Sequence, residues 1–370
     1  MRLTVVQILP ALETGGVERG TVEIARALVG RGHRAVVVSA GGRLVPALQA
    51  AGAEHVALDV GRKSLFTLRH VKPLARLLRD SDAHILHARS RLPAWIGVLA
   101  LRRLGARAPR LITTVHGPYS VNPYSAVMTR GKCIIAISNF IRDYILANYP
   151  RTDPAHIRVI HRGVSPLEFP AGYQPPGPWR ERWQRDFPAL RGRALLTLPA
   201  RVTRWKGQQD FIELVGLLRA RGADVHGLLV GAVEPRRRGF LHELQQQALR
   251  AGLAEHVTFL GQRDDVREIM SISAAVLSLA RVPEAFGRTA LEALSLGVPV
   301  VGYDHGGTSE ILRPIFPAGL VPPRDVAAAA ACAEAILARR PPIPAHHPFP
   351  LQRMVDETLA VYAELAGQRP

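Results

Sequence analysis

The chain has 370 residues and a net charge of +18, with 47% hydrophobic and 21% charged side chains, which are proportions typical of a globular protein. Its length exceeds that of one ordinary core and predicts two domains. No apolar run reaches the roughly 18 residues of a membrane-spanning helix, and we expect no signal peptide. With only two cysteines, Cys133 and Cys332, neither a disulfide framework nor a cysteine metal cluster is expected, and a cytoplasmic location is favoured.

The positive charge is concentrated in the first part of the chain. Residues 1–165 hold 24 basic and 9 acidic side chains, a net charge of +15, whereas residues 166–370 hold 24 and 21, a net charge of +3. This asymmetry favours an anionic partner for the first part, such as a membrane surface, a phosphorylated glycolipid or nucleic acid. A solvated arginine-rich surface without a partner is the alternative.

Short apolar runs alternate with helix-length amphipathic segments in the first half of the chain. Helices are expected over segments such as 16–32 and 138–149. Strands are predicted at 3–9, 34–40, 55–60, 84–88, 110–116, 133–138 and 157–163. This alternation predicts parallel sheets that are covered by helices on both faces.

Prolines and glycines interrupt the pattern near residues 164–190, which indicates a linker. Strands are then predicted at 194–200, 226–232, 256–261, 274–280 and 298–303, and an amphipathic segment follows at 354–365. We therefore predict an α/β fold of two doubly wound, Rossmann-like parallel-sheet domains that face a central cleft. Their expected bounds are 1–165 and 191–350, with a linker at 166–190 and a C-terminal helix, 351–370, that packs back on the first domain.

Several familiar nucleotide and catalytic motifs are absent. The segment "TGGVERG" (14–20) is not G-x-G-x-x-G, and the second predicted strand ends at Ser39 without a following acidic residue for a ribose, so a dinucleotide oxidoreductase is disfavoured. There is also no phosphate loop of the G-x-x-x-x-G-K-[ST] type, no G-x-S-x-G elbow and no H-E-x-x-H. The helix N-termini that follow strands remain as candidate anion sites.

Two of these loops combine glycine or positive charge with a helix start. Gly15 and Gly16 precede a predicted helix, where the missing Cβ lets a ligand approach the backbone amides. In "PARVTRWKGQQDF" (199–211), Arg201 leaves a strand, and Lys206, the only lysine in the last 238 residues, stands before Gly207 and a helix. Two cations at such a loop suit a diphosphate, and the rarity of lysine in this part of the chain favours that role over the alternative of two solvated surface charges.

A third loop, "RVPEAFG", carries a carboxylate in front of a helix. Glu284 precedes a helix that is expected to begin near Gly287 and Arg288, and the amides of Phe286, Gly287 and Arg288 would be available to ligand oxygens. Glu292 lies inside the same helix, where its carboxylate can accept hydrogen bonds from a vicinal diol such as a ribose.

The motifs together resemble the retaining glycosyltransferases of family 4, which have the two-domain GT-B fold. The resemblance rests on "ARVTRWKGQQDFI" (200–212), "VTFLGQRDDV" (257–266) and "PEAFGRTALEALSLGVPVVGYDHGGTSEIL" (283–312). In the first half "LPALETGGVERGTVEIARALVGRGH" and "VHGPYS" agree, so the match spans essentially the whole chain. The segments "HARSRLPAW", "RGV" and "TRWKGQ" look most like the branch that builds bacterial lipopolysaccharide core and related envelope glycans.

The resemblance implies a role for each matching residue. Arg201 and Lys206 would neutralise the departing donor diphosphate, Glu284 would hold sugar hydroxyls, and His116 would contact the transferred sugar near the reacting carbon. These four are the expected catalytic residues. The expected donor-binding residues are Gly15, Gly16, Arg263, Phe286, Gly287, Arg288, Thr289 and Glu292, with Arg263 near the base and Glu292 on the ribose.

Two positions depart from the family pattern. Many members have Asn-Gly-Val where this chain has Arg162, Gly163 and Val164. Many have Glu-Gly-Phe-Gly where this chain has Ala285 in place of the first glycine, so Ala285 must tolerate the backbone angles of the loop.

The implied activity is transfer of a hexosyl unit from a UDP- or GDP-sugar to a glycolipid or lipopolysaccharide-core acceptor, with the anomeric configuration retained. No cofactor and no metal are expected, because Arg201 and Lys206 supply the positive charge. The expected partners are the nucleotide sugar, the glycolipid or oligosaccharide acceptor and the anionic inner-membrane surface, with the protein peripherally attached on the cytoplasmic side; nucleic acid is not expected. The alternatives are a sugar-nucleotide epimerase or phosphorylase of the same fold, or a non-catalytic protein that binds anionic glycans.

Overall fold

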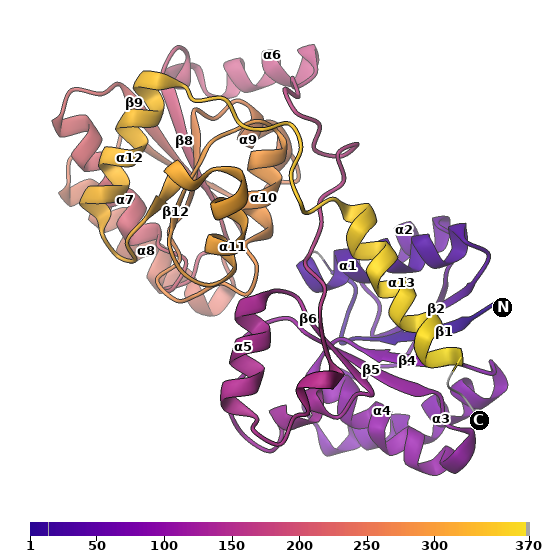
Figure 1. Cartoon of the computed structure of the whole chain (residues 1–370). Coiled ribbons are helices and arrows are strands. Elements are labelled where there is room, and N and C mark those ends of the chain that lie inside the picture. Colours follow the sequence, from indigo (N-terminus) through magenta and orange to yellow (C-terminus); the bar gives the residue numbers. More distant parts are fainter. Residues whose placement is uncertain (14, 368–370) are drawn as a thin grey trace. The chain divides into compact units, whose positions relative to one another are not determined.

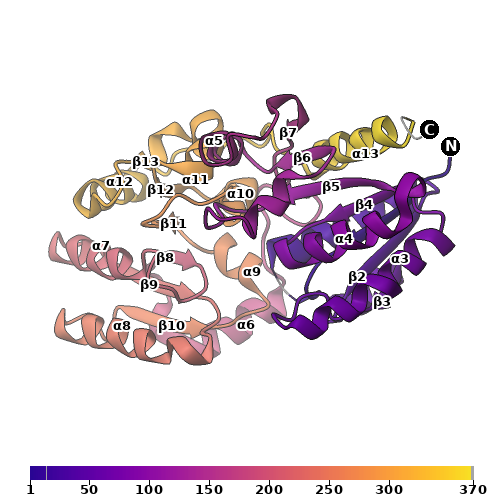
Figure 2. The ribbon, with the colours of Figure 1, turned by 90° about the horizontal axis from the view of Figure 1, so that it is seen from below.

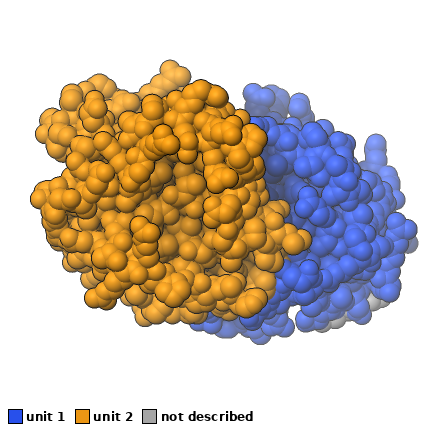
Figure 3. Space-filling model, turned by 90° about the horizontal axis from the view of Figure 1, so that it is seen from above, with its two compact units in different colours: residues 1–162, 352–370 blue, residues 163–351 orange. Residues whose placement is uncertain are grey.

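The computed structural model describes residues 1–13 and 15–367, which fall into two compact units (Figure 1). Unit 1 comprises Met1–Arg162 together with Gln352–Pro370, and unit 2 comprises Gly163–Leu351. Figure 3 colours the surface of each unit. The C-terminal segment thus returns to the unit that holds the N-terminus.

Unit 1 contains a parallel sheet of seven strands in the order β3-β2-β1-β4-β5-β6-β7. Pairing of Val5 with Ala35 on one side and with Ile85 on the other places β1 inside the sheet, between β2 and β4. The strands are β1 (Thr4–Ile8), β2 (Arg34–Ser39), β3 (Glu54–Ala57), β4 (Ile85–Ala88), β5 (Arg110–Val115), β6 (Cys133–Ala136) and β7 (Ile157–Val159). Helices cover both faces, because the chain runs from β1 to β3 in one direction and from β4 to β7 in the other.

The helices of unit 1 form two groups. One face of the sheet carries α1 (Gly16–Gly30), α2 (Val45–Ala50) and α13 (Leu351–Gly367), and the other carries α3 (Val71–Asp80), α4 (Arg91–Leu104) and α5 (Asn139–Asn148) (Figures 1 and 2). Short 3-10 helices are η1 (Leu65–His70), η2 (Gly105–Arg107), η3 (Ser125–Thr129) and η4 (Pro154–His156).

Unit 2 repeats the plan with a parallel sheet of six strands in the order β10-β9-β8-β11-β12-β13. The strands are β8 (Ala194–Pro199), β9 (Val225–Val230), β10 (Val257–Gly261), β11 (Ala275–Ser278), β12 (Val300–Tyr303) and β13 (Leu320–Val321). The helices are α6 (Gly177–Asp186), α7 (Gln208–Ala220), α8 (Arg238–Arg250), α9 (Val266–Ser271), α10 (Arg288–Ser295), α11 (Gly306–Ile315) and α12 (Val326–Arg339). Short 3-10 helices are η5 (Pro188–Leu190), η6 (Pro235–Arg237) and η7 (Pro317–Gly319).

The strands form because continuous apolar runs are buried on both faces of each sheet. Every residue of β1 and of β4 is buried, as is every residue of β9, which is the expected pattern for parallel strands between two helical layers. Helix ends are fixed locally as well: Ser138 begins α5 by accepting a hydrogen bond from the amide of Ile141 at 3.1 Å. Local pattern and burial therefore agree, and the predicted pair of doubly wound α/β domains is confirmed.

The structure differs from the sequence predictions in detail. The strand predicted at 157–163 ends at Val159, and β13 was not predicted because it has only two residues. Within the proline-rich segment 166–190, α6 forms because Trp179 and Trp183 stack on each other with ring centroids 5.2 Å apart and join the core of unit 2. Burial of two indole rings outweighs the weak helical signal of the local sequence.

Helix α13 is fastened to unit 1 by a buried polar chain. The hydroxyl of Tyr362 lies 2.6 Å from Nδ1 of His87 on β4, and Nε2 of His87 lies 2.6 Å from the hydroxyl of Thr114 on β5. Burial raises the pKa of Tyr362 to about 12 and lowers the pKa of His87, so both rings remain neutral. All three side chains are buried, and each hydrogen bond therefore replaces one that water would have provided.

We expect Tyr362→Phe to lower the free energy of unfolding of unit 1 by about 1–3 kcal/mol, because a buried nitrogen of His87 then loses its partner. Urea unfolding measures the effect. The control is Glu364→Ala in the same helix, which removes an exposed 3.7 Å ion pair with Arg158 and should cost less than about 1 kcal/mol. Equal losses in the two variants would contradict an anchoring role for the buried chain.

Candidate active site

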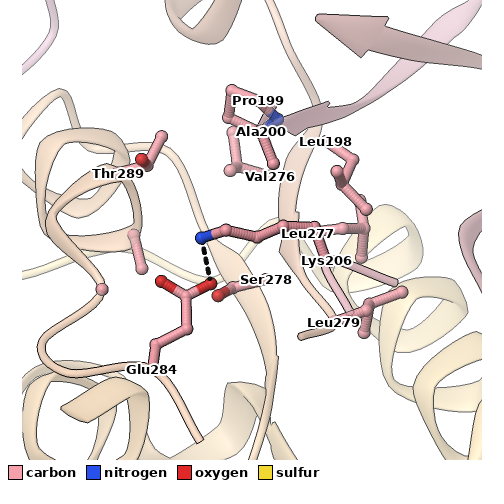
Figure 4. Close-up of a pocket in the computed structure, with 12 residues that line it drawn as sticks. Leu198, Pro199, Ala200, Lys206, Val276, Leu277, Ser278, Leu279, Glu284 and Thr289 are labelled. Atoms are coloured by element: carbon pink, nitrogen blue, oxygen red, sulfur yellow. Dashed lines mark hydrogen bonds and ion pairs between the residues drawn. The ribbon is translucent and has the colours of Figure 1, made fainter. Parts of the chain in front are cut away.

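A lysine and a glutamate from two different loops of unit 2 point toward each other in one pocket (Figure 4). Nζ of Lys206, in the loop between β8 and α7, lies 2.8 Å from Oε1 of Glu284, in the loop between β11 and α10. The side chains are 19% and 16% exposed. Residues 198–200 and 276–279 also line the pocket, together with Gly287, Thr289 and Ala290.

The pocket lies where the strand order of unit 2 reverses. β8 and β11 are neighbours, but the chain leaves β8 toward β9 and leaves β11 toward β12. Helices α7 and α10 therefore diverge to opposite faces, and the carboxyl ends of the two strands are left uncovered. Ligands of doubly wound sheets bind at such a switch point.

The two loops are pressed together at Gly207. Its φ is +79°, and a Cβ there would lie 1.9 Å from the carbonyl oxygen of Leu279, so only glycine fits. The amide of Arg281 donates to the carbonyl of Trp205 at 2.7 Å and continues the contact between the loops. Lys206 and Glu284 are held in range of each other by this backbone packing.

A buried acid supports the same contact. Asp210 in the first turn of α7 accepts from Nε of Arg281 at 2.9 Å and from the hydroxyl of Tyr303 at 2.8 Å. Burial, followed by the bond to Asp210, raises the pKa of Tyr303, which stays protonated and remains a donor. The sequence predictions missed Asp210, Arg281 and Tyr303, which lie far apart along the chain and resemble ordinary helix, loop and strand residues.

A glycine pair at the start of α11 supports the Glu284 loop from below. The amide of Gly307 donates to the carbonyl of Glu284 at 2.8 Å, and a Cβ on Gly307 would lie 2.3 Å from Cα of Phe286. Gly306 has a φ of +57°, and a Cβ there would lie 2.6 Å from the same carbonyl oxygen of Glu284. The sequence predictions assigned this pair no role, although "DHGGTSE" carries the same signal as Gly15 and Gly16: two glycines before a helix.

The loop after Glu284 follows the predicted path into α10. Phe286 is buried and meets Phe349 edge to face, with ring centroids 5.8 Å apart. Gly287 has a φ of +87° and is the residue before the first turn of α10, so its backbone amide lies at the helix start. Ala285 does not need the left-handed region, since only Asp82, Arg324 and Arg340 combine a side chain with positive φ in the described part of the chain.

Glu292 is partnered within its own helix. Its Oε1 accepts from Nε of Arg288 at 3.1 Å, and both side chains are largely buried. The two residues thus lie on one face of α10, with Arg288 at its first position and Glu292 about one turn further along. The guanidinium of Arg288 thus fixes the carboxylate in position through a charge-assisted hydrogen bond.

Two predicted cations do not line the Lys206–Glu284 pocket. The Arg201 side chain is 67% exposed, and its Nη1 lies 3.6 Å from Glu234. Arg263 forms two hydrogen bonds to Asp265, at 2.8 and 2.7 Å, beside a second hollow that Trp179 and Gln262 also line. The structure therefore brings Lys206 and Glu284 into one pocket, whereas Arg201 and Arg263 each pair with a different acid.

In unit 1, Gly15 immediately precedes α1 and Gly16 is the first residue of that helix. The carbonyl of Gly15 accepts from the amide of Arg19 at 3.0 Å. A Cβ on Gly15 would lie 2.2 Å from Oε2 of Glu18, whereas one on Gly16 would meet nothing within 4 Å. The preceding residue of the "TGGVERG" motif, Thr14, lies outside the described residues.

His116 follows β5 and is bonded to an arginine that the sequence predictions noted only as a departure from the family pattern. Nη2 of Arg162 lies 2.8 Å from Nδ1 of His116. Because a guanidinium can only donate, Nδ1 accepts, and the proton of the neutral ring must be on Nε2. Nε2 is buried and has no hydrogen-bond partner among the described residues, so it is an N–H donor that still requires an acceptor.

Burial lowers the pKa of His116, and the charges of Arg162 and Arg89 and the nearby His87 lower it further. The ring is therefore neutral near pH 7. Arg162 and Arg89 are both buried, and α1 lies against the first of them, because a Cβ on Gly20 would lie 2.4 Å from its Nη1. Unit 1 thus holds two guanidinium groups near the carboxyl ends of β4 and β5.

No group of three or more His, Cys, Asp or Glu side chains that could hold a metal ion occurs within residues 1–13 and 15–367. Within the described residues, no helix is both long enough and apolar enough to span a membrane.

We expect Gly207→Ala to cost distinctly more stability than Gly222→Ala. Both glycines have similar positive φ values, +79° and +85°, but a Cβ at Gly222 meets nothing within 4 Å. The Gly222 variant should lose about 1–2 kcal/mol from the left-handed backbone alone. The Gly207 variant should lose a further 1–3 kcal/mol, roughly, from the overlap with Leu279. Urea unfolding of unit 2 gives both values, and equal losses would show that the loop contact is not a constraint.

We also expect the stability of unit 1 to fall as the pH drops below about 6.5, the ordinary pKa of histidine. The unfolded chain then binds a proton that folded His116 resists, because its folded pKa is lowered. Replacing His116 with Asn should flatten the dependence by up to about 1.4 kcal/mol per pH unit. Urea unfolding between pH 7 and pH 5 measures the slope, and an unchanged slope would mean that His116 is protonated in the folded state.

Comparison with known proteins gives a consistent result along the chain. Residues 14–166 match the family model "Glycosyltransferase Family 4", and residues 180–346 match "Glycosyl transferases group 1". A 2-deoxystreptamine N-acetyl-D-glucosaminyltransferase of Streptomyces fradiae is 32% identical over 154 residues, which cover 41% of this chain and 35% of that protein. A lipopolysaccharide core biosynthesis mannosyltransferase of Rhizobium meliloti is 32% identical over 113 residues, or 30% of this chain and 32% of that protein. The chain spans about a third to two thirds of the length of such curated relatives.

Solved structures resemble the whole chain. A glycosyltransferase of Rickettsia africae superimposes with a TM-score of 0.82 at 26% identity, and the match covers 98% of both chains. HepE of Anabaena, solved in complex with UDP and glucose, has a TM-score of 0.77 at 18% identity and shows that the fold is shared, with 98% of this chain and all of that chain covered. On this fold and these two family matches, the chain belongs to the GT-B glycosyltransferases that join a family 4 domain to a group 1 domain, as the sequence motifs predicted.

Proposed function

We propose that the protein is a retaining glycosyltransferase that moves a hexosyl unit from a UDP- or GDP-sugar to a hydroxyl group of a glycolipid or lipopolysaccharide-core acceptor. The observation that carries the proposal is the Lys206–Glu284 pair at the carboxyl edge of the unit 2 sheet. A cation and a carboxylate in one pocket match the two ends of the donor's reacting part: an anionic diphosphate and a polyhydroxylated sugar.

The donor class is supported by the neighbours of this fold. HepE of Anabaena was solved with UDP-glucose as well as with UDP and glucose. In this chain Gly287 and Thr289, at the start of α10, line the same pocket as Lys206, and a helix N-terminus favours anions. We assign the diphosphate to Lys206 and this helix start, the sugar hydroxyls to Glu284, and the ribose to Glu292.

The proposed chemistry breaks the bond between the anomeric carbon and the diphosphate oxygen and forms a bond from the same carbon to the acceptor oxygen on the same face. The acceptor proton passes to the departing phosphate oxygen, so the reaction needs no separate base. Lys206 stabilises the charge that develops on the diphosphate, in a pocket where water is partly excluded. No metal ion is required in this scheme, because cationic side chains compensate the leaving group.

The roles of Arg201 and Arg263 in the proposal depend on the acids with which they already pair. Each is held by an acid, Arg201 by Glu234 and Arg263 by Asp265. Because the Arg201 side chain is 67% exposed, it can exchange its 3.6 Å contact with Glu234 for a diphosphate at little cost in solvation. Arg263 is fixed by two hydrogen bonds, so we assign the base to the hollow that it lines with Gln262 and not to its guanidinium.

In unit 1 the proposal assigns His116 to the transferred sugar. Its protonated Nε2 lacks an acceptor among the described residues and can donate to a sugar oxygen. Because the ring is neutral, it supplies a hydrogen bond without adding charge next to an oxocarbenium-like sugar. Gly15 and Gly16 are assigned to the phosphate through their backbone amides.

The acceptor is inferred from charge and from relatives. Residues 1–165 carry a net charge of +15, and one relative is a lipopolysaccharide core mannosyltransferase. A phosphorylated glycolipid at the inner membrane matches that charge, and we place the protein on the cytoplasmic side, peripherally attached.

The alternative functions differ in what they consume and release. A sugar-nucleotide epimerase would consume donor without an acceptor, and a phosphorylase would require inorganic phosphate. A glycan-binding protein would release no nucleotide at all.

We expect Lys206→Ala to lower the turnover number by about 100- to 1,000-fold, the effect of removing one donor that stabilises transition-state charge. Release of UDP or GDP from UDP-glucose, UDP-N-acetylglucosamine and GDP-mannose, with and without added core oligosaccharide, measures turnover. A melting-temperature increase with the same nucleotide sugar shows that the variant still binds donor.

The matched control is Arg204→Ala in the same loop. The Arg204 side chain is 65% exposed, pairs with Glu243 and does not line the pocket, so this variant should keep wild-type turnover. Wild-type turnover in the Lys206 variant would remove the diphosphate contact from the mechanism. Donor consumption that is independent of oligosaccharide would favour the epimerase alternative.

A further inference from the structure

A segment of unit 1 presents apolar side chains to solvent within a dense group of cations. Leu65, Phe66 and Leu68 in η1 are 87%, 79% and 49% exposed. A single exposed apolar residue is ordinary in a protein surface, but three within four positions, one of them an almost fully exposed phenylalanine, form a patch. We call residues 61–79, which include η1 and α3, the η1–α3 segment.

The exposure is imposed by a tight hydrogen-bonded turn. The buried hydroxyl of Thr67 donates to the carbonyl of Arg62 at 2.5 Å, and the amide of Thr67 donates to the carbonyl of Ser64 at 3.1 Å. The hydroxyl of Ser64 accepts from the amide of Phe66 at 3.3 Å. Thr67 is thus buried at this turn, whereas its neighbours Phe66 and Leu68 lie on the exposed side.

The cations in this segment have almost no counter-charge. Residues 61–79 contain six basic residues and no acidic one, and two of the four lysines of the chain are among them. All six are exposed: Arg62, Lys63, Arg69, Lys72, Arg76 and Arg79. Only Arg79 has an ion pair in the described part of the chain, with the adjacent Asp80 at 3.0 Å.

This combination distinguishes between two kinds of partner. The cores of protein interfaces are depleted in lysine and other charges, so a protein partner would leave most of these cations without a match. The headgroup layer of an anionic bilayer accepts apolar tips at the acyl boundary and offers phosphates to the surrounding lysines and arginines, whose aliphatic stems adapt to both.

We infer that the η1–α3 segment is the surface through which unit 1 docks on anionic lipid, with Leu65 and Phe66 inserted and Arg62, Lys63, Lys72 and Arg76 on lipid phosphates. The inference gives the membrane attachment in the proposed function a defined location. It rests on the proposed function only for the reason why this protein would bind a membrane. Its evidence is the exposure, the turn and the charge of the segment.

The experiment is flotation of the full chain with vesicles of phosphatidylcholine alone and of phosphatidylcholine mixed with phosphatidylglycerol, at low and at high salt. We expect binding only with phosphatidylglycerol, weakened by salt. The double variant Leu65→Ser with Phe66→Ser should lose most of the binding. Lys63→Gln with Lys72→Gln should weaken binding on the order of 25-fold, or roughly fivefold per charge.

Leu167→Ser is the matched control, because Leu167 is 90% exposed but belongs to unit 2, and it should bind like the wild type. Unchanged melting temperatures verify that all variants are folded. Wild-type binding in both double variants, or equal loss in the control, would overturn the inference. Salt-resistant binding to pure phosphatidylcholine would do so as well.

The same variants separate this inference from the proposed function. Release of UDP or GDP with a soluble oligosaccharide acceptor should be unchanged in them, since no residue of the segment lines the pocket. If nucleotide release fails in the wild type while vesicle binding follows the prediction, the glycosyl-transfer proposal fails and the docking surface stands.

Discussion

The candidate site depends on the close approach of two backbone loops where β8 and β11 end. At Gly207 a side chain would overlap the carbonyl of Leu279, so the loop that carries Lys206 and the loop that leads to Glu284 are in direct van der Waals contact. Asp210 and Arg281 fasten this contact from one side, and Gly306 and Gly307 support it from another. A flexible lysine is thereby given a defined position, since its backbone and its carboxylate partner are both fixed. Such a supporting shell separates a pre-organised site from two charges that merely lie near each other.

Unit 1 uses buried polar groups for a different purpose. The chain from Tyr362 through His87 to Thr114 fastens the last helix of the protein to the first sheet. Nearby, Arg162 fixes the tautomer of His116 and, with burial, keeps its ring neutral. Arginine at position 162 therefore has an electrostatic effect that asparagine would not have there, because an uncharged amide would not lower the pKa of the histidine through its charge.

The positively charged side chains of the two units differ in how many of them are paired with acids. In unit 2 most arginines are engaged: Arg201, Arg263, Arg281 and Arg288 each have an acidic partner. In the η1–α3 segment of unit 1, five of the six cations have no ion pair in the described residues, and the same segment carries the exposed apolar side chains. Unpaired charge beside exposed hydrophobic side chains indicates a contact, whereas paired charge on a surface contributes mainly to solubility.

The sequence alone determined the elements that depend on local pattern. Alternation of apolar runs with amphipathic segments specified both parallel sheets, and glycine before a helix marked the loops at Gly15, Gly207 and Gly287. The sequence pattern missed α6, because proline and glycine dominate the local signal while the burial of Trp179 and Trp183 is a tertiary effect.

Only the tertiary structure decided which charges meet. Glu284 lies 78 positions from Lys206 in the chain, and Arg162 lies 46 from His116. Arg201 and Lys206, only five positions apart, pair with different acids, Glu234 and Glu284, because a side chain's partner depends on which distant segments fold next to it, and spacing along the chain does not encode that.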